Sequence, residues 1–157
     1  MPNDNIIFSD APFTEGQRLN FASLLDMMIP PSEDGRMPGA SELDILGYIQ
    51  SQANDFIAVL DEGLTSLDDM ANKKYDKNFY ALPDADRQAL VDEIKTLQPA
   101  FIQGLVFQTV ACYYQNDRVV QALGLEARPP YPKGYTVEAG DMSLLDPVRQ
   151  RSKLYRE

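Results

Sequence analysis

Apolar side chains recur at spacings of three and four over most of the chain, which is the pattern of helices that bury one face. The clearest stripes are formed by Phe21 with Leu24 and Met28, and by Leu60 with Leu64. The spacing predicts five main helices and a short sixth, over residues 14–29, 41–53, 55–70, 83–97, 99–114 and 118–123.

Residues with specific preferences at helix ends set these boundaries. Thr14 followed by Gln17 fits a capping box, while Pro30 and Pro31 cannot continue the first helix, so residues 29–40 must form a loop. Pro83 suits the first turn of the fourth helix. Residues 99–114 are apolar nearly all round, which predicts a central helix buried on most of its sides.

No alternating pattern of strands and no internal repeat interrupts this series, so the sequence predicts an all-α fold. The expected architecture is a single-domain helical bundle over residues 14–124. An N-terminal arm, residues 1–13, would precede it. Residues 125–157 are rich in proline and glycine without a sustained period, and we expect an extended, irregular C-terminal arm.

Composition and charge narrow the possible partners. Of 157 residues, 44% are hydrophobic and 24% charged, which is typical of a folded globular protein. The net charge of −10 opposes binding to nucleic acid, because that affinity comes from neutralising phosphates with Lys and Arg. No apolar run reaches the length needed to span a bilayer.

The residues that usually carry catalysis or metal binding are sparse. Histidine is absent and Cys112 is the only cysteine, in an apolar segment where a structural thiol is expected. The acidic loop at residues 32–35 lacks the ligand spacing of a calcium-binding loop. No motif for flavin, nucleotide or haem attachment occurs, so we expect no catalytic, cofactor or metal site in this chain.

Several sequence landmarks appear in a recognisable order. They are MIPPSEDGRMPGA at residues 28–40, Tyr48-Ile49, EGLTSLDDMA at 62–71, Phe79 with Leu82, Pro99-Ala100-Phe101, and TVACYYQNDRV at 109–119. In kind and spacing they resemble the gluconate 2-dehydrogenase subunit 3 family, over roughly residues 13–124.

This resemblance implies a helical, non-catalytic subunit bound to a large FAD-containing dehydrogenase of the glucose-methanol-choline type. Such complexes oxidise sugars, sugar acids or polyols and often pass electrons to a cytochrome c subunit. The small subunit is implied to support folding, stability or export of the large one. FAD is therefore expected in the partner.

Two features differ from the family pattern. Members often begin with a twin-arginine export signal, whereas residues 1–12 have neither a basic region nor an apolar stretch. Many continue with Tyr-Gly-Gly-Asn and a tryptophan, whereas this chain has no tryptophan. The location is expected to be cytoplasmic from the absent signal, or periplasmic if the chain is exported with a partner.

The leading hypothesis is therefore an accessory subunit whose C-terminal arm wraps a large subunit. Candidate partner-binding residues are Pro30, Pro31, Tyr131, Tyr135, Leu144, Leu145, Arg149 and Arg151. The alternative for the tyrosines and leucines is that they close the protein's own core.

Two other functions stay open at this point. One is a cytoplasmic homodimeric scaffold without a flavoprotein partner. The other is a small enzyme that uses Glu33, Asp34 and Tyr48 on a sugar-like ligand.

Overall fold

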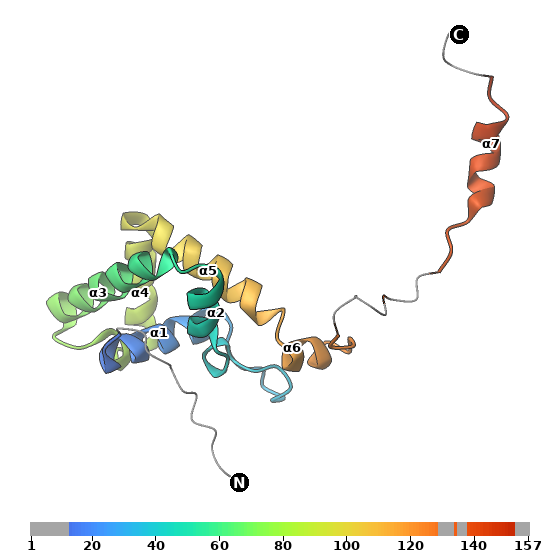
Figure 1. Ribbon diagram of the computed structural model, residues 1–157. Coiled ribbons are helices and arrows are strands. Elements are labelled where there is room, and N and C mark those ends of the chain that lie inside the picture. The colour runs from blue at the N-terminus through green and yellow to red at the C-terminus, as the bar shows by residue number, and fades with distance from the viewer. Residues whose placement is uncertain (1–12, 129–133, 135–137, 153–157) are drawn as a thin grey trace. The chain divides into compact units, whose positions relative to one another are not determined.

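The computed structural model describes residues 13–128, 134 and 138–152 (Figure 1). The chain divides into two units, Met1–Ala127 and Arg128–Glu157, and each is described by itself. Every regular element in the described residues is a helix, which confirms the all-α prediction. None of those helices is long and apolar enough to cross a membrane.

The first helix, α1 (Glu15–Met28), begins with the expected capping box. The Thr14 side chain accepts a hydrogen bond from the Gln17 backbone N–H at 3.2 Å, and the Gln17 side chain accepts one from the Thr14 N–H at 2.9 Å. Its apolar stripe, including Phe21 and Leu24, is buried as the spacing predicts. The helix ends at Met28, ahead of the two prolines.

The second helix begins later than predicted. Residues Ala40–Glu42 form a 3₁₀ turn, η1, and α2 covers only Ile45–Gln52. The expected start at Ser41 was wrong because Asp44, not Ser41, is the N-cap. Its carboxylate accepts a hydrogen bond from the Gly47 backbone N–H at 2.9 Å, which satisfies one of the free donors at a helix start.

The third helix, α3 (Phe56–Tyr75), continues past the predicted end at Met70. Lys73 and Lys74 lie in its last turn, where positive charge favours the negative end of the helix dipole. Asp76 then takes a left-handed conformation with φ of 54° and ends the helix.

A partly buried polar cluster joins α1, α3 and the short turn η2 (Phe79–Ala81). The fully buried Asn20 donates to Asp68 at 3.1 Å and accepts from the Tyr80 backbone N–H at 2.9 Å. Asp68 also accepts from the Phe79 N–H at 3.1 Å. These bonds hold η2 on the bundle, where Phe79 and Leu82 are buried as predicted.

The central helix, α5 (Pro99–Tyr113), packs against α2, α3 and α4 (Asp84–Leu97) (Figure 1). Two glycines allow this close packing. A Cβ atom at Gly63 in α3 would lie 2.3 Å from the Phe101 ring, and one at Gly104 in α5 would lie 2.3 Å from the Phe56 ring. A short helix, α6 (Asp117–Ala122), follows α5.

The second unit contains a short helical segment that the sequence did not predict. Residues Met142–Leu145 form a 3₁₀ turn, η3, which continues into α7 (Asp146–Arg149). Asp141 caps the turn by accepting a hydrogen bond from the Ser143 backbone N–H at 3.0 Å. The prediction of a wholly irregular arm was therefore wrong at this segment, where Asp141 supplies a local helix start.

Candidate functional site

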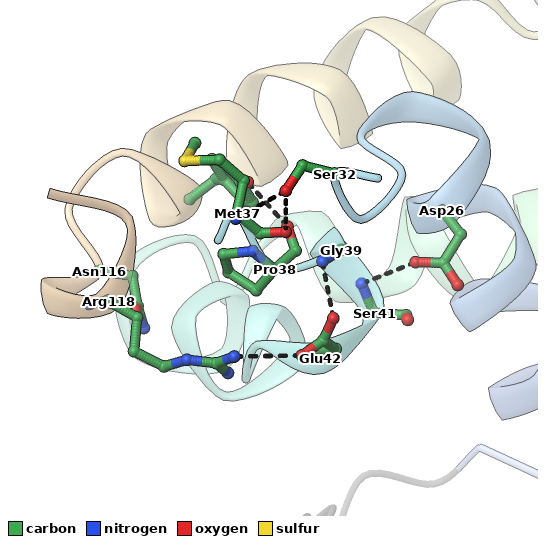
Figure 2. A network of polar contacts seen from close by, with 10 residues as sticks. Asp26, Ser32, Met37, Pro38, Gly39, Ser41, Glu42, Asn116 and Arg118 are labelled. Atoms are coloured by element: carbon green, nitrogen blue, oxygen red, sulfur yellow. Dashed lines mark hydrogen bonds and ion pairs between the residues drawn. The ribbon is translucent and has the colours of Figure 1, made fainter. Parts of the chain in front are cut away.

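Residues 29–42, here called the signature loop, are closed by hydrogen bonds at the base and again nearer the tip, and Figure 2 shows the bonds nearer the tip. At its base the Ala40 backbone N–H donates to the Ile29 carbonyl at 2.9 Å. Nearer its tip the Ser32 N–H donates to the Met37 carbonyl at 3.0 Å, and the Met37 N–H donates to the Ser32 hydroxyl at 2.9 Å. The loop therefore has a defined conformation.

Gly39 lets the two sides of the signature loop lie in contact. A Cβ atom there would stand 2.9 Å from an Asp26 carboxylate oxygen and 3.0 Å from the Pro31 ring. That oxygen of Asp26 accepts a hydrogen bond from the Ser41 backbone N–H at 3.2 Å (Figure 2). Helix α1 is thus tied directly to the end of the loop.

The loop is also tied to α5 and α6. The Tyr113 hydroxyl, buried at the end of α5, donates to the Pro38 carbonyl at 2.7 Å. Glu42 accepts from the Gly39 N–H at 2.9 Å and from Arg118 at 3.2 Å (Figure 2). Burial is the main cause that raises the pKa of Tyr113, so this hydroxyl stays protonated and remains a donor.

The acidic tip of the loop is organised by its own residues. Asp34 accepts from the Ser32 hydroxyl at 2.7 Å and pairs with Arg36. The bond from Ser32 and then those from Arg36 lower the pKa of Asp34 to about 2, so its carboxylate is charged at neutral pH. Among the described residues, no group of three or more His, Cys, Asp or Glu could hold a metal ion.

Asp34 and Tyr48, two residues of the hypothetical small enzyme, have separate partners. Asp34 contacts Ser32 and Arg36 within the loop, whereas the Tyr48 hydroxyl accepts from Gln115 at 3.5 Å. The hydrogen bonds that Asp34 accepts from Ser32 and Arg36 all lie within the loop and join it to no other part of the bundle.

A second feature is an apolar groove between α1, α4 and α5, with a volume of about 650 Å³. It is lined by Leu24, Met27, Met28, Gln88, Val91, Asp92, Lys95, Ile102, Gln103, Val106, Phe107, Val110 and Ala111. The prediction that α5 is buried on most sides was wrong for this face. Val106, Phe107 and Val110 are exposed, because α4 and α1 leave the groove open between them.

Cys112 lies in α5 next to Ala111, the last residue of that helix to line the groove, and is half-buried. Burial, with a smaller contribution from the charge of Asp44, raises the pKa of its thiol. The thiol is therefore kept in its unreactive protonated form, in line with the structural role expected from the sequence.

The predicted partner-binding residues fall in different places. Pro30 and Pro31 are exposed in the signature loop. In the second unit, Leu144 and Leu145 are exposed, Arg149 pairs with Asp146 at 3.2 Å, and Arg151 is exposed. Tyr131 and Tyr135 lie outside the described residues.

The sequence did not predict the groove, and none of the six partner-binding candidates that the structure describes lines it. The sequence signal was that α5 is apolar around its whole circumference, but this pattern does not show which side of the helix stays uncovered.

The family model of gluconate 2-dehydrogenase subunit 3 matches residues 15–126, which is well over half of the chain. The chain belongs to the gluconate 2-dehydrogenase subunit 3 family. No curated protein and no solved structure matches the chain.

In this subunit 3 family member, the matched residues hold both the signature loop and the apolar groove. The second unit, with Leu144 and Leu145, lies beyond the matched range. The family takes its name from a subunit of gluconate 2-dehydrogenase, which implies an accessory role in a dehydrogenase made of several subunits.

Proposed function

We propose that this chain is a non-catalytic small subunit that binds and stabilises, or helps to export, a large FAD-dependent dehydrogenase of the glucose-methanol-choline type. The observation that carries the proposal is the family match over residues 15–126. The substrate of the complex would be a sugar or sugar acid. FAD would be bound by the large subunit, and a cytochrome c subunit would accept its electrons.

Two kinds of surface support a role in binding. The signature loop is held by Asp26, Tyr113 and Arg118 in one conformation before any partner arrives. A preformed surface loses little conformational entropy on association, which favours affinity. Pro30 and Pro31 lie exposed in this loop and are available for contact.

The second unit offers apolar side chains that its own residues do not cover. Leu144 is 74% exposed, and Met142, Leu145 and Val148 are also exposed. Because aliphatic side chains gain free energy when they leave water, a partner surface would stabilise this segment. We propose that it forms a second contact with the large subunit, in addition to the matched domain.

The proposal is tested by isolating the complex from the native host. The chain is tagged, purified under mild conditions, and examined for a flavoprotein of several hundred residues with dye-linked sugar or sugar-acid dehydrogenase activity. Stoichiometric recovery of such a protein supports the proposal. Recovery of the chain as a colourless homodimer would contradict it and would favour the scaffold hypothesis.

Deletion of the second unit gives a further readout. We expect a chain ending at Ala127 to remain folded, because the buried core lies within Phe13–Val119. Its affinity for the large subunit should fall if residues 128–157 make a contact. An unchanged affinity would confine binding to the matched domain.

A further inference from the structure

The apolar groove between α1, α4 and α5 is open to solvent along the surface of α5. Phe107 lines it and is 68% exposed, and Val106 and Val110, also exposed, lie on the same side of α5. Leu24, Met28 and Ile102 form much of its floor. A continuous apolar trough of this kind, bounded by helices, is the form that receives an amphipathic helix.

The charges on the three helices that form the groove narrow the choice of occupant. Three basic residues lie on its three helices: Arg18, Arg87 and Lys95. Six acidic residues lie on the same helices: Glu15, Asp26, Asp84, Asp86, Asp92 and Glu93. A second copy of the chain would bring a second net charge of −10 to this surface. Repulsion between two chains of like net charge favours the monomer, and the same negative charge opposes binding to anionic lipid.

The groove itself is lined by one acidic and one basic side chain, Asp92 and Lys95, so the further charges that bear on the occupant lie at its end. A smaller polar pocket adjoins it and shares Met27 and Gln88 with it, and Asp26, Asp84 and Arg87 line that pocket. Lys95 lies nearer the other end of α4. Asp84 is already paired with Arg87, whereas among the described residues Asp26 accepts only from the Ser41 backbone N–H. An occupant with a basic group at the Asp26 end would therefore complement both the apolar floor and this carboxylate.

We propose that this groove receives an amphipathic helix of the large dehydrogenase subunit, with an apolar stripe along one face and Lys or Arg toward Asp26. This inference rests on the proposed function and adds the site and the chemistry of the contact. Phe107 is the expected anchor, since exposed aromatic side chains that become buried dominate many interfaces.

Photo-crosslinking locates the occupant. A photoreactive phenylalanine analogue replaces Phe107 in the full chain, the complex is isolated from the native host and irradiated, and the linked peptide is identified. Linkage to a helical segment of the flavoprotein, with apolar residues at spacings of three and four and a flanking Lys or Arg, is the expected result. Linkage to a second copy, or to residues 138–152 of this chain, would overturn the proposal.

A charge variant tests the energetic role of the groove. Phe107→Glu should lower the affinity for the flavoprotein at least about tenfold. Leu97→Glu is the matched control, because Leu97 is 65% exposed and lies at the end of α4 outside the groove. Circular dichroism of both variants checks that they fold.

The outcomes separate the two proposals. If the unmodified chain recovers no flavoprotein, the proposed function fails and this inference fails with it. If the unmodified chain and both variants recover it with equal affinity, the proposed function stands and the groove assignment is overturned. Loss confined to Phe107→Glu supports both.

Discussion

The Tyr113→Phe substitution tests whether the signature loop is held by a specific buried bond. It removes one oxygen atom, the hydroxyl that donates to the Pro38 carbonyl at 2.7 Å, and keeps the ring that packs in the core. Pro38 is itself buried. Its carbonyl would therefore lose a partner where water does not readily replace it.

The magnitude follows from that burial. Leaving a buried acceptor unsatisfied costs about 1–3 kcal/mol, whereas an exposed hydroxyl contributes little. For a domain of this size, about 2 kcal/mol corresponds to a fall in Tm of roughly 4–8 °C. The pH dependence of the free energy of unfolding gives a second test. Because the pKa of Tyr113 is raised in the folded state, the native protein should lose stability above pH of about 10. The Tyr113→Phe variant lacks this hydroxyl and should lose less stability over the same pH range.

The assay is thermal and urea unfolding followed by far-UV circular dichroism. Tyr114→Phe is the matched control, since Tyr114 is the next residue and is 54% exposed. We expect a clear loss of stability for Tyr113→Phe and a change within about 0.5 kcal/mol for the control. Equal stability of the two variants would refute the argument that this bond holds the loop.

Three further predictions concern the bundle. Gly63→Ala should lower the free energy of unfolding by about 1–3 kcal/mol, because the new methyl group meets the Phe101 ring. Gly16→Ala in α1 is the control and should be neutral or stabilising. Urea midpoints that shift equally in the two variants would contradict this reasoning. Asn20→Ala should cost about 1–3 kcal/mol, measured in the same way, and hydrogen exchange at the Tyr80 amide should accelerate; an unchanged amide would contradict the role of Asn20. Cys112 should react with iodoacetamide at pH 8 more slowly in the native protein than in urea, and equal rates would show that burial does not protect it.

Helix positions could be predicted well where local chemistry and periodicity agree. The capping box at Thr14 and the prolines after Met28 define α1 in both the sequence and the structure. At α2 two residues, Ser41 and Asp44, could both act as a cap. The choice of Asp44 depends on the 3₁₀ turn that the loop forms around Gly39, and this turn is set by tertiary contacts with Asp26 and Pro31.

The candidate site was less predictable, because it depends on which helix faces are left uncovered. The sequence showed that α5 is apolar all round, but periodicity cannot tell whether α1 and α4 close over Phe107. The bond from Tyr113 to Pro38 joins residues 75 positions apart, and no local pattern indicates it. By contrast, the loop after α1 was predicted from Pro30 and Pro31, which cannot continue that helix.

The central claim, that this chain binds and stabilises a large flavoprotein, is tested most directly by producing the large subunit with and without it. A partner that binds only the native state of the large subunit raises the stability of that subunit, because binding removes native molecules from the unfolding equilibrium. The account predicts that the large subunit made with this chain retains FAD and resists thermal inactivation, and that without it both decline. Equal FAD content and equal inactivation rates in the two preparations would contradict the account.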